Sequence, residues 1–139
     1  MEVILMKFWK QAVLFYLGGC AYMGLELLWR GRSHGSMFLA GGACFLLIGQ
    51  LNHVRPRLPL LLRAVVGAGI VTMVELAVGL LCNRNFEVWD YRDRSGNFLG
   101  QICPAFTFLW IPVSLMALGL YELLSRRVDR AGIRRCAYL

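Results

Sequence analysis

Four long apolar stretches occupy most of this 139-residue chain, and they limit its fold more than any other feature. An apolar helix of about 20 residues crosses the roughly 30 Å hydrocarbon core of a bilayer. Only 17% of the residues are charged, whereas an average soluble domain has about 25%. We therefore predict an all-α integral membrane protein, a four-helix bundle that forms a single transmembrane domain over residues 1–139. The predicted spans are 8–29, 36–51, 59–82 and 98–124, followed by a basic tail at 125–139.

The spans must be helical, because four isolated strands cannot close a barrel and satisfy their backbones in lipid. The second stretch is short, and a re-entrant segment is the alternative for it. Leu17–Cys20 resembles a lipoprotein cleavage box, but the sequence stays apolar to Trp29, so we expect no cleavage. Pro104 and Pro112 fall inside the fourth stretch, where each removes a backbone donor. The carbonyls of Gly100 and Phe108 would then lose their helical partners, which predicts kinks.

Basic residues predict the orientation of the spans. With four crossings, one side of the membrane carries Lys7, Lys10, Arg55, Arg57, Arg63, Arg126, Arg127, Arg130, Arg134 and Arg135. The other side carries Arg30, Arg32, Arg84, Arg92 and Arg94. We therefore expect a multi-pass protein of the cell (inner) membrane with both termini cytoplasmic. In the tail, Arg126, Arg127, Arg130 and Arg134 suit anionic lipid headgroups, and we expect no nucleic acid there because the charge adjoins a span. Trp9, Trp29 and Trp89 lie near predicted interfaces.

The two halves of the chain share a pattern that predicts an internal repeat. Gly18 precedes Glu26 by eight residues, and Gly67 precedes Glu75 by eight. A polar loop and a helix with Gly-x-x-Cys, at 41–44 and at 100–103, should follow in each half. Two-span units imply parallel repeats about an axis along the membrane normal. Coincidence in a glycine-rich and leucine-rich chain is the alternative.

Each glutamate shares a helical stripe with small residues, so we expect both to face the bundle interior. Glu75 lies roughly 10 Å inside the end of the third span. A carboxylate at that depth costs a few kcal/mol unless it is protonated, paired or hydrated. A proton, cation or substrate site and a purely structural acid both remain open for Glu75. Glu26 has Arg30 one turn later, which favours an interfacial ion pair.

The outer loop at 83–97 mixes charged and aromatic residues. It would lie in the headgroup layer, cover a polar cleft, or remain a solvated, self-paired loop. The candidates for a substrate or ion pathway are Glu26, Arg30, Glu75, Trp89, Asp90, Tyr91, Asn97 and Gln101. We expect no metal and no cofactor, because calcium-loop spacing is lacking and His34 and His53 fall on opposite faces. A disulfide between Cys82 and Cys103, which flank the loop, stays open.

Several blocks of sequence resemble a known family. They are Glu26–Gly31, Ser36–Phe38, Val88–Tyr91 and Asn97–Cys103. Together they resemble the small ABC-transporter permeases of the CmpB type over roughly residues 17–110. The resemblance implies a polytopic permease and no particular substrate. Family members often carry a serine after the tyrosine and a proline before the asparagine segment, whereas this chain has Arg92 and Gly96 in those regions.

Three functions remain in competition. The first is a permease-like membrane protein that moves, or helps to move, a small solute or ion. The second is a non-transporting structural or regulatory subunit. The third is a membrane-embedded enzyme acting on lipid, which we favour less because no enzyme motif is present. No ATPase motif is present either, so an ATP-driven system would need a separate ATPase subunit. Four spans are few for a pathway, which predicts a homodimer or a larger membrane complex.

Overall fold

The structure, a computed structural model, describes residues 1–54 and 56–137, with side chains up to Gly132. Its four α-helices are α1 (Glu2–Arg30), α2 (Gly35–Gln50), α3 (Leu60–Cys82) and α4 (Pro104–Ala137). Over the described residues the chain has no strand, only an isolated bridge between Phe98 and Ile102. The predicted all-α, four-helix architecture is confirmed.

Local sequence sets the helix ends. Gly31 adopts φ 69°, a left-handed conformation that suits glycine, and its N–H donates to the Leu27 carbonyl at 2.9 Å to end α1. The Nδ1 atom of His34 accepts from the Ser36 N–H at 3.2 Å and so caps the start of α2. The first helix begins earlier than predicted, at Glu2, whose carboxylate lies in the first turn, where the helix dipole favours negative charge.

The predicted start of the fourth helix at residue 98 is wrong. Residues 98–103 form a turn, and α4 begins at Pro104. A proline in the first helical position loses no helical hydrogen bond, because that N–H has no partner within the helix. Gly100 keeps a partner as well, since its carbonyl accepts from the Tyr91 N–H at 3.0 Å. The expected kink at Pro104 is therefore wrong, and only Pro112 lies inside the helix.

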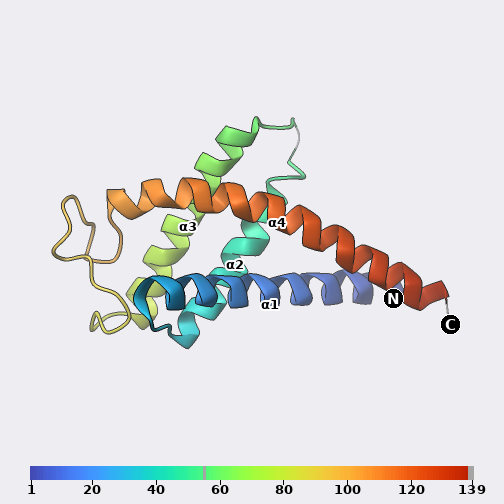
Figure 1. Cartoon of the computed structure of the whole chain (residues 1–139), viewed down its shortest axis with the longest axis horizontal. Helices are drawn as coiled ribbons and strands as arrows, with labels where there is room; N and C mark the ends of the chain where they lie inside the picture. The colour runs from blue at the N-terminus through green and yellow to red at the C-terminus, as the bar shows by residue number, and fades with distance from the viewer. Residues whose placement is uncertain (55, 138–139) are drawn as a thin grey trace.

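The two longest helices, α1 and α4, run in opposite directions, while α2 and α3 lie obliquely across them (Figure 1). An ion pair between Lys10 Nζ and Asp129 Oδ2, at 2.7 Å, joins the first part of α1 to the last part of α4. The start of α1 and the end of α4 therefore lie at one end of the molecule. The loop between α3 and α4 lies at the other end (Figure 1).

Among the described residues, three helices are long and apolar enough to cross a membrane, judged by length and composition: α1, α3 and residues 104–132 of α4. Their large apolar side chains face outward, as Leu61, Leu81 and Phe108 do, each at least 69% exposed. The 16-residue helix α2 measures about 24 Å, less than the roughly 30 Å of a bilayer core. Its complete crossing, and so a fourth span, stays a prediction.

Small residues bring the helices together, as the stripes predicted. A side chain at Gly18 would overlap Phe45 of α2, and a Cβ at Gly67 would lie 2.8 Å from the Ser114 Cβ of α4. Glu26 and Glu75 are 6% and 7% exposed, which confirms that both face inward. The proposed register of the repeat is wrong, because residues 41–44 lie within α2 whereas 100–103 lie in the turn before α4. A duplication in some other register stays a prediction.

Candidate functional site

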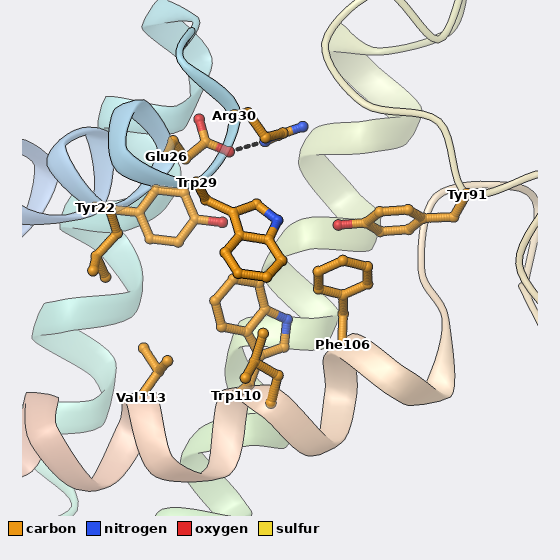
Figure 2. A pocket seen from close by; sticks show the side chains of 10 residues that line it. Tyr22, Glu26, Trp29, Arg30, Tyr91, Phe106, Trp110 and Val113 are labelled. Carbon is orange, nitrogen blue, oxygen red and sulfur yellow. Dashed lines mark hydrogen bonds and ion pairs between the residues drawn. The ribbon is translucent and has the colours of Figure 1, made fainter.

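A pocket of about 250 Å³ lies between the C-terminal part of α1, the α3–α4 loop and the first turns of α4 (Figure 2). Its lining is largely aromatic, with one ion pair at the edge. The lining residues are Tyr22, Leu25, Glu26, Trp29, Arg30, Tyr91, Phe106, Leu109, Trp110 and Val113. Three of them, Glu26, Arg30 and Tyr91, are among the residues singled out from the sequence.

Glu75 of α3 lies directly behind two of the pocket's side chains. Its Oε1 accepts a hydrogen bond from the Tyr91 hydroxyl at 3.0 Å, and its Oε2 accepts one from the Trp110 indole N–H at 3.2 Å. It has no ion pair with any residue that the structure describes. Both carboxylate oxygens are therefore held by neutral donors, which stabilise the charged form less completely than an arginine would.

The predicted ion pair between Glu26 and Arg30 is present, and the Glu26 carboxylate is almost fully buried in it. Ser33 Oγ donates to the second Glu26 oxygen at 2.9 Å. A further guanidinium nitrogen of Arg30 donates to the Val88 carbonyl at 3.1 Å. Glu26 and Arg30 are thus satisfied by each other and by neighbouring groups, and they fasten the end of α1 to the loop.

A buried amide network holds the loop in place. Asn83, the residue that ends α3, donates from Nδ2 to the Trp89 carbonyl at 2.7 Å and to Gln101 Oε1 at 3.1 Å, and its Oδ1 accepts from the Val88 N–H at 2.9 Å. Gln101 Nε2 donates back to the Asn83 carbonyl at 3.0 Å, and the Trp89 indole N–H donates to the Gln101 carbonyl at 2.9 Å. Every polar atom of these two amides and this indole is therefore used for structure.

This network also accounts for Trp89, which the sequence placed near a membrane interface. An indole at an interface can keep its N–H in water, but the Trp89 side chain is 3% exposed and its N–H is bonded inside the loop. The loop matches one of the arrangements that the sequence left open, because its outer side is exposed and self-paired. Its inner side contributes Tyr91 to a pocket that is largely aromatic rather than to a polar cleft.

Asp90 and Asn97 lie on that outer side. Arg92 donates to both carboxylate oxygens of Asp90, at 2.7–3.0 Å, and this holds the pKa of Asp90 below its usual range. Asn97 donates to the Arg92 and Arg94 carbonyls and accepts from the Gly100 N–H, so it organises the turn. Neither side chain lines the pocket. Of the eight residues predicted for a pathway, the structure gathers Glu26, Arg30, Glu75 and Tyr91 at the pocket and uses the other four to build or pair the loop.

Burial raises the pKa of the Tyr91 phenol far above its usual value, and the neighbouring Glu75 carboxylate raises it further. The hydroxyl therefore stays protonated at all physiological pH values and remains a donor to Glu75. The Tyr91 ring stacks on Phe106, with centroids 4.8 Å apart and planes at 14°. These contacts fix the side chain as one wall of the pocket.

Sequence reasoning missed four aromatic pocket residues, Tyr22, Trp29, Phe106 and Trp110. It also missed Asn83 as the centre of the loop network. Tyr22 lies four residues before Glu26, one turn away on the same stripe, and this was a usable signal. Phe106 and Trp110 are also one turn apart, but the false helical assignment of 98–103 obscured their place at the start of α4. An asparagine directly after a span, as at Asn83, is a common helix end and gave no stronger signal.

Residues outside the pocket are simpler to place. Arg126 pairs with Glu122 at 2.9 Å on the exposed side of α4, and Arg127 and Arg130 are exposed. The Arg134 side chain lies outside the described residues. Cys82 and Cys103 are both free thiols, so no disulfide joins them. The residues that the structure describes contain no cluster of His, Cys, Asp and Glu that could hold a metal ion.

Comparison with known proteins agrees with the resemblance seen in the sequence. The family described as "Putative ABC-transporter type IV" matches residues 30–134, about three quarters of the chain. No curated protein and no solved structure matches the chain. The match includes the loop network, Glu75 and the α4 side of the pocket. This chain, a multi-pass membrane protein by the length and composition of its helices, therefore belongs to the Putative ABC-transporter type IV family.

Proposed function

We propose that the chain is a permease-like membrane component that moves, or helps to move, a small solute or ion, and that this solute binds in the pocket below the α3–α4 loop. The observation that carries the proposal is Glu75, a carboxyl group 7% exposed within a membrane-length helix, whose donors among the described residues are both neutral. A packing contact at this depth is available from serine or threonine at lower desolvation cost. An acid retained there is better explained by a charged or protonated ligand.

The family name supports a place in a transport system. The chain carries no phosphate-binding motif for ATP, so the proposal includes a separate ATPase subunit. Four helices enclose a small volume, and we propose that a second copy or a larger membrane complex completes the pathway. We also propose that both termini are cytoplasmic, because the more basic end of the molecule should stay inside.

The lipid-acting enzyme finds less support in the structure. Its candidate residues were Glu26, Glu75, Asp90 and Asn97 or Gln101. Asp90 and Asn97 lie on the outer side of the loop, and Gln101 is consumed in the loop network. Of this set, Glu26 alone lines the pocket, and it is already paired with Arg30. The set therefore places no acid and base together at the pocket.

The test is a Glu75→Gln substitution in the full chain. Glutamine fits the site, because its amide oxygen can accept from Trp110 while its amide nitrogen donates to the Tyr91 oxygen. We expect normal folded yield and loss of transport. Charge movement is recorded from proteoliposomes after concentration jumps of small cations, anions and zwitterions, and again with any ATPase that co-purifies in mild detergent.

Glu122→Gln is the matched control, because Glu122 is an exposed acid on α4 that pairs with Arg126 away from the pocket. It should leave transport unchanged. A Glu75→Gln protein that transports like the native chain would contradict the proposal. So would an isolated chain that produces no response and brings no partner through purification.

A further inference from the structure

We propose that the pocket binds an organic cation with a quaternary or alkylated ammonium headgroup. This inference rests on the proposed function, because it names the solute class of the same site. The supporting feature is a set of five aromatic side chains around one small space, together with Glu75 behind them, a carboxyl group that has no ion pair with any described residue. The five are Tyr22, Trp29, Tyr91, Phe106 and Trp110.

The aromatic rings come from three separate segments and form walls on several sides. Tyr22 and Trp29 belong to α1, Tyr91 to the loop, and Phe106 and Trp110 to α4. Figure 2 shows the hydroxyls of Tyr22 and Tyr91 pointing toward one another from opposite walls. The Tyr22 and Trp110 centroids are 5.9 Å apart with planes at 34°, so these rings meet at an angle. Tyr91 and Phe106 each use one face to stack on the other, and their remaining surfaces adjoin the pocket with the other three rings. Several ring faces around one space are the arrangement that recognises alkylated ammonium groups.

The charges at the pocket select a cation over an anion. Glu26 and Arg30 neutralise each other. A second guanidinium nitrogen of Arg30 donates to the Val88 carbonyl. Among the residues that the structure describes, Glu75 has no ion-pair partner, so it is the group left to balance a bound cation. It also accepts hydrogen bonds from Tyr91 and Trp110, and a donor bonded to a carboxylate becomes more electron-rich. The negative charge is therefore transmitted to two of the ring faces that line the pocket.

The lining also separates organic from inorganic cations. Hard metal cations take oxygen ligands, commonly six or more for calcium and magnesium. The pocket offers mostly ring carbons and aliphatic side chains, with Leu25, Leu109 and Val113 between the rings. An alkylated ammonium needs no inner oxygen ligands, since its charge is spread over methyl groups that contact ring faces directly. The volume of about 250 Å³ lies below the usual range for drug-sized ligands, which favours a small headgroup.

Binding of radiolabelled choline to the purified full chain in phosphatidylglycerol nanodiscs tests the proposal. We expect saturable binding that tetramethylammonium displaces. The neutral isostere 3,3-dimethyl-1-butanol has the same shape without the charge, and it should compete at least ten-fold more weakly. Glu75→Gln should weaken choline binding, and Trp29→Ala should weaken it roughly 2- to 30-fold, the range of one cation–π contact.

Trp29→Ala is a safe variant for folding, because the Trp29 side chain is 73% exposed. Its matched control is Trp9→Ala, which removes an exposed tryptophan of the same helix outside the pocket and should leave binding unchanged. Equal competition by choline and its neutral isostere would overturn the proposal. Unchanged choline binding in both Trp29→Ala and Glu75→Gln would also overturn it. So would displacement of bound choline by phosphate or glutamate but not by tetramethylammonium.

The same chemistry is presented by a free solute and by a phosphatidylcholine headgroup. Both sources satisfy the proposal, and nanodiscs of phosphatidylcholine distinguish them. A weaker apparent affinity for choline in those nanodiscs identifies the lipid headgroup as a competitor, whereas an unchanged affinity identifies a free solute. Choline binding without any transport would uphold this inference and contradict the proposed function. Transport of another solute without choline binding would uphold the proposed function and contradict this inference.

Discussion

The loop network around Asn83 gives a prediction whose size follows from the structure. Asn83→Ala removes three hydrogen bonds. Two are fully buried and run from Asn83 Nδ2 to the Trp89 carbonyl and to Gln101 Oε1. The third is partly buried and runs from the Val88 N–H to Asn83 Oδ1. Each buried group left without a partner costs about 1–3 kcal/mol. Taking the lower end for each of the three gives a loss of about 3 kcal/mol.

The backbone of the loop makes this loss harder to relieve. Phe86 and Leu99 adopt φ of 56° and 53°, the left-handed region that non-glycine residues seldom occupy. Such conformations cost about 1–3 kcal/mol each and persist only where surrounding contacts compensate. Without the Asn83 amide, we expect the loop to open and the Tyr91 contact to Glu75 to weaken with it.

The assay is unfolding in mixed micelles by increasing SDS, together with limited trypsin digestion at the loop arginines. Asn83→Asp is a sharper variant, because it keeps the shape but sets an acceptor against the Trp89 carbonyl and Gln101 Oε1. It should be at least as damaging as Asn83→Ala. Asn85→Ala is the matched control, an exposed asparagine two residues further on, and should change stability by less than about 0.5 kcal/mol. If Asn83→Ala and Asn85→Ala behave alike, the network does not hold the loop and the reasoning fails.

Three further predictions concern packing, charge and topology. Gly49→Ala should destabilise the fold by about 1–3 kcal/mol, because the new methyl group overlaps the Tyr121 ring; Gly69→Ala meets nothing within 4 Å and should match or exceed native stability in the same SDS titration. The pKa of Asp90 is lowered chiefly by hydrogen bonds from Arg92, so their pair should persist at neutral pH and be lost as the pH falls through that lowered value. Arg92→Ala should then move the Asp90 titration to higher pH, as followed by NMR. Reporter fusions in the α2–α3 loop and in the α3–α4 loop should read opposite sides of the membrane, and two cytoplasmic readings would show that α3 does not cross.

Much of the helical framework was predictable from the sequence, because apolar length and small-residue spacing act locally along one helix. The ends of α2 and α3 lie within one residue of the predicted bounds. The inward direction of Glu26 and Glu75 followed from their stripes, and the Glu26–Arg30 pair followed from a spacing of four residues. These features depend on the helical period, which the order of residues reveals directly.

The loop and the pocket depended on contacts between distant segments. An apolar run from Phe98 read as the start of a span, but pairing of Asn83 with Gln101, 18 residues apart, holds 98–103 as a turn and makes Pro104 the first residue of α4. The same folding brings Tyr91 to Glu75 and Trp110 to Glu75, 16 and 35 residues apart. Helical periodicity carries no information about such pairs, because they are set by which helix ends meet. The sequence alone therefore determined four helices and an inward-facing acid at Glu75. The tertiary structure decided that this acid lies behind an aromatic pocket rather than beside an arginine.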